Sequence, residues 1–179
     1  LADLPRPILL SVGRVAIEKN LESFLDAPVA GTKVVVGEGP ALAQLQKRYP
    51  GAIFMGALSG GELAQAYAAA DVFVFPSKTD TFALVILAAL SSGLPVAAYP
   101  VAGPIDVLQG CEAAALRHNL QEACLTALEL NPRHAREHAE KFTWQQTTLQ
   151  FVANLCTNKM ANENLTTTKT IVGITQAKT

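Results

Sequence analysis

The sequence predicts an α/β domain of three layers, in which a mainly parallel sheet lies between helices and further helices follow at the C-terminal end. Short apolar runs rich in Val, Ile and Phe alternate with segments of helical periodicity along most of the chain. Gly and Pro stand at many of the junctions, as strand-to-helix connections require. The 179 residues are 50% hydrophobic and carry a net charge of −1, which suits one globular domain with a full core.

Strands and helices are expected to alternate along the chain. Apolar runs that can be buried on both faces predict the strands, at residues 7–13, 32–37, 52–56, 71–75, 95–99 and 112–116. Segments opened or stopped by Pro or Gly predict the helices between them, at residues 20–27, 40–49, 62–70 and 82–92. Three C-terminal helices are predicted at residues 120–130, 132–141 and 143–156, the last with Thr143 as its N-cap.

Charge and composition exclude several classes of protein. A pI of about 6.3 gives no sign of a nucleic-acid partner. Cys111, Cys124 and Cys156 lack metal-ligand spacing and predict reduced thiols. No apolar run approaches the roughly 20 residues that span a bilayer, and no signal peptide is expected. We therefore expect a cytoplasmic protein, either free or associated peripherally with the inner face of the membrane.

The remaining titratable residues give no sign of a metal centre. His118, His134 and His138 lie near no acid–base partner in the sequence, so we expect them at the surface. The sequence has no His-Glu-x-x-His, Walker or Asp-x-Asp motif. On the helix predicted at residues 62–70, Glu62 is expected as first-turn charge and Tyr67 as a packing residue.

The most informative segment is residues 71–96, which predict a buried strand, a polar loop, a helix and a second buried strand. In open α/β sheets, ligands bind outside the carboxyl ends of the strands and against helix N-termini. Residues 77–84 are therefore where a phosphate and a sugar are expected. The carboxylate of Asp80 can accept hydrogen bonds from sugar hydroxyls. Alternatively, Asp80 or Thr81 serves as the N-cap of the helix that follows.

Two cations, Arg14 and Lys19, lie in the loop that leaves the first predicted strand after Gly13. An Arg side chain offers a bidentate fork and a Lys side chain a point charge, so together they can hold a diphosphate. The alternative is a pair of solvated surface cations, one of them paired with Glu18.

These segments resemble the signature of retaining glycosyltransferases of the GT-B type, close to glycosyltransferase family 4 (group 1). The family motif is Glu-x7-Glu within a phrase such as Ser-x-x-Glu-Thr-Phe-Gly-Leu. In this chain the first acid is Asp80, the glycine position holds Ala83, and the second acid position holds Ala88. The resemblance implies a Rossmann-like domain that forms one half of a GT-B fold.

The resemblance also implies roles for individual residues. Arg14 and Lys19 stand in an intact Gly-Arg-x4-Lys pattern, whose cations hold the donor diphosphate and stabilise its charge as the nucleotide leaves. Asp80 would orient the transferred sugar, and these three residues form the predicted catalytic set. The other predicted donor-binding positions are Gly13, Gly37, Gly56, Leu58, Thr81, Phe82, Ala83, Leu84, Ala88 and Gly103. For the glycines and Leu58, tight turns and strand ends are the structural alternative.

Residues 1–157 are accordingly expected to be the nucleotide-sugar-binding domain of a retaining hexosyltransferase, and residues 158–179 a disordered tail. Transfer from a nucleotide diphosphate sugar would be to a hydroxyl of a sugar or lipid, without a metal cofactor. The acceptor would be held by an N-terminal domain absent from this sequence, so we expect the fragment alone to be inactive. Two alternatives stay open: a degenerate non-catalytic nucleotide-binding or interaction module, motivated by Ala83 and Ala88, and half of a nucleotide-sugar epimerase.

Overall fold

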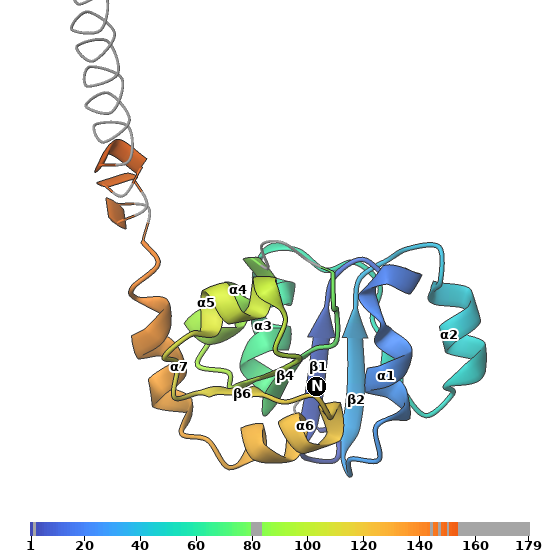
Figure 1. Cartoon of the computed structure of the whole chain (residues 1–179). Coiled ribbons are helices and arrows are strands. Elements are labelled where there is room, and N and C mark those ends of the chain that lie inside the picture. The colour runs from blue at the N-terminus through green and yellow to red at the C-terminus, as the bar shows by residue number, and fades with distance from the viewer. Residues whose placement is uncertain (2, 80–83, 144, 147, 150, 154–179) are drawn as a thin grey trace, which may run out of the picture. The chain divides into compact units, whose positions relative to one another are not determined.

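The structure is a computed structural model that describes residues 1, 3–79, 84–143, 145–146, 148–149 and 151–153. It divides into two units, Leu1–Glu140 and Lys141–Thr179. All of the strands and helices named below belong to the first unit. Figure 1 shows this unit with the carboxyl ends of β1 and β2 pointing to the top of the view.

A parallel sheet is the centre of the first unit. Among the described residues, six strands pair in parallel in the order β3-β2-β1-β4-β5-β6. The strands are β1 (Ile8–Val12), β2 (Thr32–Val36), β3 (Ile53–Phe54), β4 (Val72–Phe75), β5 (Val96–Ala98) and β6 (Ala114–Leu116). The chain builds outward from β1 in one direction and then returns to add β4 on its other side. The strand order therefore reverses between β1 and β4, which is where ligands bind in such sheets.

Helices cover both faces of the sheet. They are α1 (Leu21–Asp26), α2 (Leu42–Arg48), α3 (Gly60–Ala69), α4 (Leu84–Ser91), α5 (Ala102–Leu108), α6 (Leu120–Leu128) and α7 (Pro132–Ala139), with a short 3₁₀ helix η1 (Ile17–Lys19). One core cluster joins the sheet to α3, α4, α5 and α7, and the other joins it to α1, α2 and α6. This arrangement confirms the predicted three-layer, Rossmann-like α/β fold with C-terminal helices.

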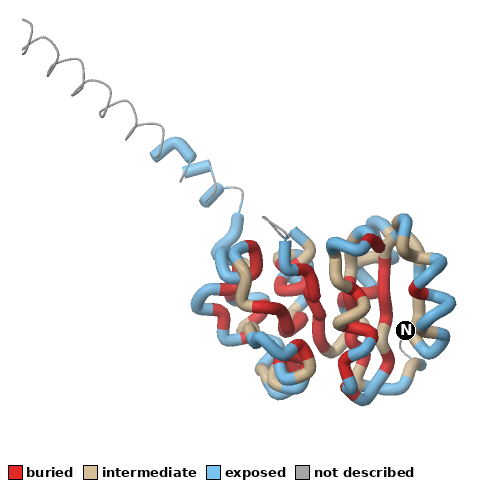
Figure 2. The backbone as a smooth tube through the Cα atoms, turned by 45° about the vertical axis from the view of Figure 1, so that its right-hand side comes forward, coloured by how far each residue is buried: buried red, intermediate tan, exposed pale blue. Residues whose placement is uncertain are grey.

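Successive residues of a strand face opposite layers. Leu9 belongs to the core cluster that includes α1, and Leu10 belongs to the core cluster that includes α4. Both residues are fully buried. Because both faces are covered, the strands appear in the sequence as continuous apolar runs rather than as alternating patterns. Figure 2 shows the buried strands enclosed by helices whose outer surfaces are exposed.

Most element boundaries agree with the sequence to within two residues, and the differences have local causes. Residues 17–19, expected as loop, form η1. The helix expected from Pro40 begins at Leu42, because the Ala41 amide donates to the Val15 carbonyl across the loop at 3.0 Å. The segment around Gly103 forms α5, which begins at Ala102. Gly93, with φ +75°, ends α4 as predicted.

The surface prediction was wrong for His138. This residue is 5% exposed, and its Nε2 lies 2.8 Å from the Val107 carbonyl oxygen. The contact joins α7 to α5 across a sequence separation of 31 residues. His134 is partly exposed and lies 3.1 Å from Glu112. Tyr67 packs in the core as predicted, with its ring centroid 5.8 Å from that of Phe73.

Three further sequence predictions can be compared with the structure. Cys124 forms no disulfide, as predicted, and burial raises its pKa to about 12, so its thiol stays protonated. In the second unit, Thr143 Oγ1 accepts a hydrogen bond from the Gln146 amide at 3.1 Å, which confirms the predicted cap. Along the described part of the chain, no helix combines the length and the apolar character needed to cross a membrane.

Candidate functional site

A pocket of about 210 Å³ opens at the carboxyl ends of β1 and β4, where the strand order reverses. Most of it is formed by the end of β1 with the loop that follows, the end of β4 with its loop, and the first turn of α4, and one residue each of α1 and β2 completes it. The lining residues are Ser11, Val12, Gly13, Arg14, Lys19, Leu21, Val35, Phe75, Pro76, Ser77, Leu84 and Val85. This is the position that the topology of an open parallel sheet provides for a ligand.

Both predicted cations line this pocket. Arg14 follows β1 directly, and its Nη1 lies 3.6 Å from Oε1 of Glu18, with 66% of the Arg14 side chain exposed. Lys19 ends η1, where its amide donates to the Ala16 carbonyl at 3.1 Å. The structure therefore brings the two cations together beside Gly13, and the pairing with Glu18 that the surface alternative expected is also present. An exposed ion pair of this kind is weak, roughly 0.2–1 kcal/mol, so it does not prevent Arg14 from meeting an anion.

The predicted glycines form a row along the carboxyl edge of the sheet. The Gly13 amide donates to the Val36 carbonyl at 2.9 Å, and the Gly37 amide donates to the Gly56 carbonyl at 2.7 Å. Gly37 has φ +138°, and a Cβ built there would lie 1.8 Å from the Gly13 oxygen. Close backbone packing therefore accounts for the glycine at position 37. Of this row, Gly13 lines the pocket, whereas Gly37 and Gly56 do not.

Two predicted residues lie away from the pocket. Leu58 borders a separate hollow together with Met55 and Glu62, near α3. Gly103 is buried in the first turn of α5. The structure does not bring either residue to the cation pair.

The centre of the family-like motif, Asp80, Thr81, Phe82 and Ala83, lies outside the described residues. The described part of α4 begins at Leu84, which is 68% exposed and lines the pocket. Ala88 is exposed on the same helix, four residues further on. Residues at this spacing share one helix face, so position 88 lies on the face that carries Leu84.

Sequence reasoning missed Asn20. Its backbone is left-handed, with φ 53°, and its Nδ2 donates to the Pro76 carbonyl at 3.0 Å. Asn is one of the few residues that tolerate this conformation, so an Asn at position 20 was the sequence signal that could have indicated the turn. Ser77 lies just beyond Pro76, is 1% exposed, and its Oγ donates to the Glu18 carbonyl at 3.5 Å. Two hydrogen bonds thus connect the loop after β1 to the loop after β4.

Three cations lie at this edge on the described residues, together with the carboxylates of Glu18 and Glu38. Besides Arg14 and Lys19, Lys78 extends from the loop after β4, with its Nζ 4.5 Å from the ring centroid of Tyr99. Among the residues that the structure describes, no cluster of three or more His, Cys, Asp or Glu side chains is arranged to hold a metal ion. The described pocket is therefore suited to an anionic ligand.

A parallel sheet of this strand order, with a pocket at its switch point, defines a Rossmann-like α/β class of domain. The chain belongs to the family Glycosyl transferases group 1, whose model matches residues 6–129. Its fold is that of one Rossmann-like domain of the GT-B glycosyltransferases.

Three comparisons illustrate the relationship. Over 162 residues the chain is 37% identical to the sulfoquinovosyl transferase SQD2 of Arabidopsis thaliana, covering 80% of this chain and 32% of that protein. It is 44% identical over 105 residues to a GDP-mannose-dependent alpha-mannosyltransferase of Mycobacterium tuberculosis, covering 58% and 28%. The sucrose-phosphate synthase structure from Thermosynechococcus elongatus superposes with a TM-score of 0.70 at 25% identity, covering 90% and 47%. The chain thus spans about a third of the length of these curated relatives.

Proposed function

We propose that this domain binds a nucleotide diphosphate sugar and serves as the donor half of a retaining hexosyltransferase. The observation that carries the proposal is that Arg14 and Lys19 both line the pocket at the switch point of the sheet. The names of the relatives support it, because they describe transfer of sulfoquinovosyl and mannosyl groups, the latter from GDP-mannose.

In this proposal, Arg14 and Lys19 hold the two phosphates and stabilise the charge that develops as the nucleoside diphosphate leaves. A preorganised cation pair contributes most at that stage, because the bond to the sugar breaks with negative charge accumulating on the phosphate oxygens. This cation pair would replace a divalent ion, so we propose transfer without a metal. Asp80 would orient the sugar, and a second domain would hold the acceptor hydroxyl of a sugar or lipid.

The names of the relatives favour glycosyl transfer over the two alternative functions, and experiment distinguishes the three. A non-catalytic binding or interaction module would show no turnover in the full-length protein. A nucleotide-sugar epimerase would return an epimerised donor rather than a glycosylated acceptor. A retaining transferase would give a product with the anomeric configuration of the donor, which NMR of the product measures.

The donor site is tested by calorimetric titration of this chain with UDP, GDP and ADP, in parallel with a Lys19→Met variant. Loss of a charged hydrogen-bond partner costs roughly 1.5–3 kcal/mol, or about one to two decades in affinity. The matched control is Lys47→Met, which removes an exposed cation from α2, far from the pocket lining. Absence of binding by a folded wild-type chain, or equal affinities for wild type and Lys19→Met, would refute the proposal.

A further inference from the structure

We propose that Asn20 is a positioning residue for the donor diphosphate. Its side-chain amide connects the turn that contains Lys19 to the loop after β4. The inference rests on the proposed donor site, since it concerns how Lys19 is presented to that site. Asn20 itself does not line the pocket, although its two neighbours in the sequence, Lys19 and Leu21, both do.

The backbone of Asn20 forms the junction between two helices. It caps the C-terminal end of η1, where its backbone N–H donates to the Ile17 carbonyl at 3.0 Å, and it immediately precedes α1. Its φ of 53° and ψ of 34° turn the chain sharply at this point. The conformation of Asn20 therefore sets the direction of the backbone at Lys19 relative to α1.

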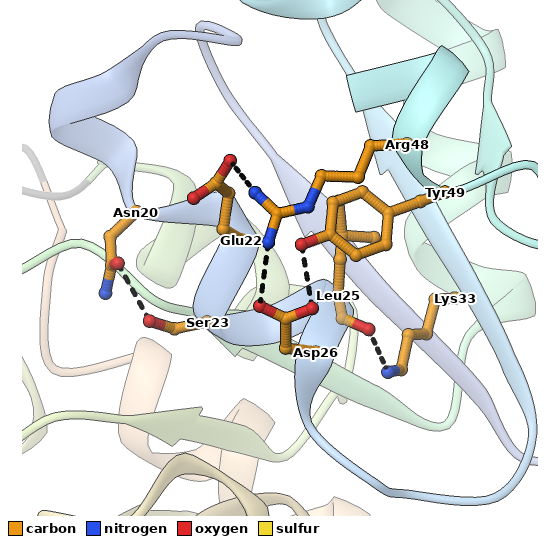
Figure 3. Close-up of polar contacts among 8 residues, drawn as sticks. All are labelled: Asn20, Glu22, Ser23, Leu25, Asp26, Lys33, Arg48 and Tyr49. Carbon is orange, nitrogen blue, oxygen red and sulfur yellow. Dashed lines mark hydrogen bonds and ion pairs between the residues drawn. The ribbon is translucent and has the colours of Figure 1, made fainter. Parts of the chain in front are cut away.

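The side chain of Asn20 makes two contacts in different directions. Nδ2 donates to the Pro76 carbonyl at 3.0 Å, 56 residues away in the sequence. Oδ1 accepts from Ser23 Oγ at 2.8 Å, within α1, as Figure 3 shows. The first contact crosses the switch point from the β1 side to the β4 side. The second joins the side chain to the first turn of α1.

Contacts that do not involve Asn20 hold α1 in place, and Asn20 stands between α1 and Lys19. Arg48 Nη1 lies 2.7 Å from Glu22 Oε1, and Tyr49 donates its hydroxyl to Asp26 at 2.8 Å. Lys33 Nζ donates to the carbonyls of Leu25 and Ala27 at 2.7 and 2.6 Å. Most of these contacts appear in Figure 3, and they connect α1 to β2 and to the C-terminal end of α2.

Fixing this turn matters because a Lys side chain is flexible. Each rotamer-rich side chain that a ligand immobilises lowers the affinity, and a backbone already held in place reduces that cost. A glycine at position 20 would adopt the same backbone conformation but would leave the Pro76 carbonyl unheld. The side-chain amide of Asn20 therefore adds a restraint that the left-handed turn itself does not require.

The inference is tested with Asn20→Gly, which keeps the left-handed turn and removes both side-chain contacts. Ser23→Ala is the matched control, because it removes the contact within α1 and leaves the donor group to Pro76. Both variants, wild type and Lys19→Met are titrated with UDP, GDP and ADP by calorimetry. We expect Asn20→Gly to weaken binding of the nucleotide that wild type prefers by about 3- to 10-fold, the range of a neutral hydrogen bond. Ser23→Ala should stay within about twofold.

A double variant separates positioning from a general effect on the fold. If Asn20 acts through Lys19, Asn20→Gly should change the affinity little when Lys19 is already Met, so the two losses are not additive. Full additivity, or unchanged binding by Asn20→Gly, would overturn the inference and leave the donor site standing. A folded wild type that binds none of the three nucleotides, or that binds as well without Lys19, would overturn the donor site and the inference together.

Discussion

Gly37 packs against Gly13 so closely that a Cβ at position 37 would lie 1.8 Å from the Gly13 carbonyl oxygen. The two residues end neighbouring strands, and the pocket opens immediately beside Gly13. The contact therefore sets the distance between the loops that follow β1 and β2. Neither loop can shift independently of the other.

Gly37→Ala should destabilise the domain by about 2–4 kcal/mol, because the methyl group meets backbone and the φ of +138° is strained for any L side chain. The free energy of unfolding from urea denaturation measures this. Gly51→Ala is the control, since a Cβ there meets nothing within 4 Å. We expect it to stay within about 0.5 kcal/mol of wild type. Equal stability of the two variants would contradict the packing described here.

Ala88→Glu should tighten binding of a nucleoside diphosphate by about one to two decades, because a carboxylate at this position can accept hydrogen bonds from ribose hydroxyls. Position 88 is exposed and lies one helical turn from Leu84, which lines the pocket. Calorimetry of the variant beside wild type measures the effect.

Ala68→Glu provides the matched control for this prediction. Ala68 is also an exposed alanine within a helix, α3, and does not line the pocket. The same added charge there should leave the affinity unchanged. If Ala88→Glu and Ala68→Glu behave alike, the helix face of α4 does not reach the nucleotide.

Glu18→Gln should strengthen binding of a nucleoside diphosphate. Glu18 lies 3.6 Å from Arg14, and both side chains are at least half exposed, so the pair contributes roughly 0.2–1 kcal/mol. Removing the carboxylate frees Arg14 and lowers repulsion of the phosphates, which predicts an increase in affinity of up to about fivefold. The gain should diminish as salt is added, because exposed charges are screened. An unchanged affinity at low ionic strength would show that Arg14 does not meet the ligand.

Tyr67→Phe should reduce the loss of stability at high pH. Burial raises the pKa of Tyr67 to about 12 from an ordinary value of 10. The folded state therefore holds the phenol proton more tightly than the unfolded chain, so this contribution is complete below pH 10 and is lost as the pH rises towards 12. Urea denaturation at pH 8, 10 and 11 measures the effect. Cys124, whose pKa burial also raises to about 12, remains in the variant, so the alkaline loss should shrink without disappearing.

The fold could be predicted from the sequence because its signals are local. A short apolar run bounded by a turn residue fixes a buried strand, and Gly93 alone is sufficient to end α4. The buried His138 could not be predicted, because its partner is a carbonyl 31 residues away and the surrounding helix is otherwise polar. Tertiary contacts of α7, among them the hydrogen bond to α5, decide that position.

The candidate site could be predicted in part for the same reason. Arg14 and Lys19 belong to one short segment, so the sequence alone predicts that they lie close together. Asn20 depends on a contact with Pro76, which the sequence does not reveal. The resemblance implied Leu58 and Gly103, and neither lines the pocket, since Leu58 lies beside α3 and Gly103 within α5.

An NMR titration would locate the nucleoside diphosphate on the sheet. The isotope-labelled chain is titrated with the nucleotide that binds, and amide shifts are followed at both ends of the strands. The donor site predicts that the amides of Gly13, Lys19 and Ser77 move, while Asp71 and Leu130, which border a hollow at the amino ends of the strands, stay unchanged. Shifts concentrated at Asp71 and Leu130, with the Gly13 and Lys19 amides unmoved, would contradict it.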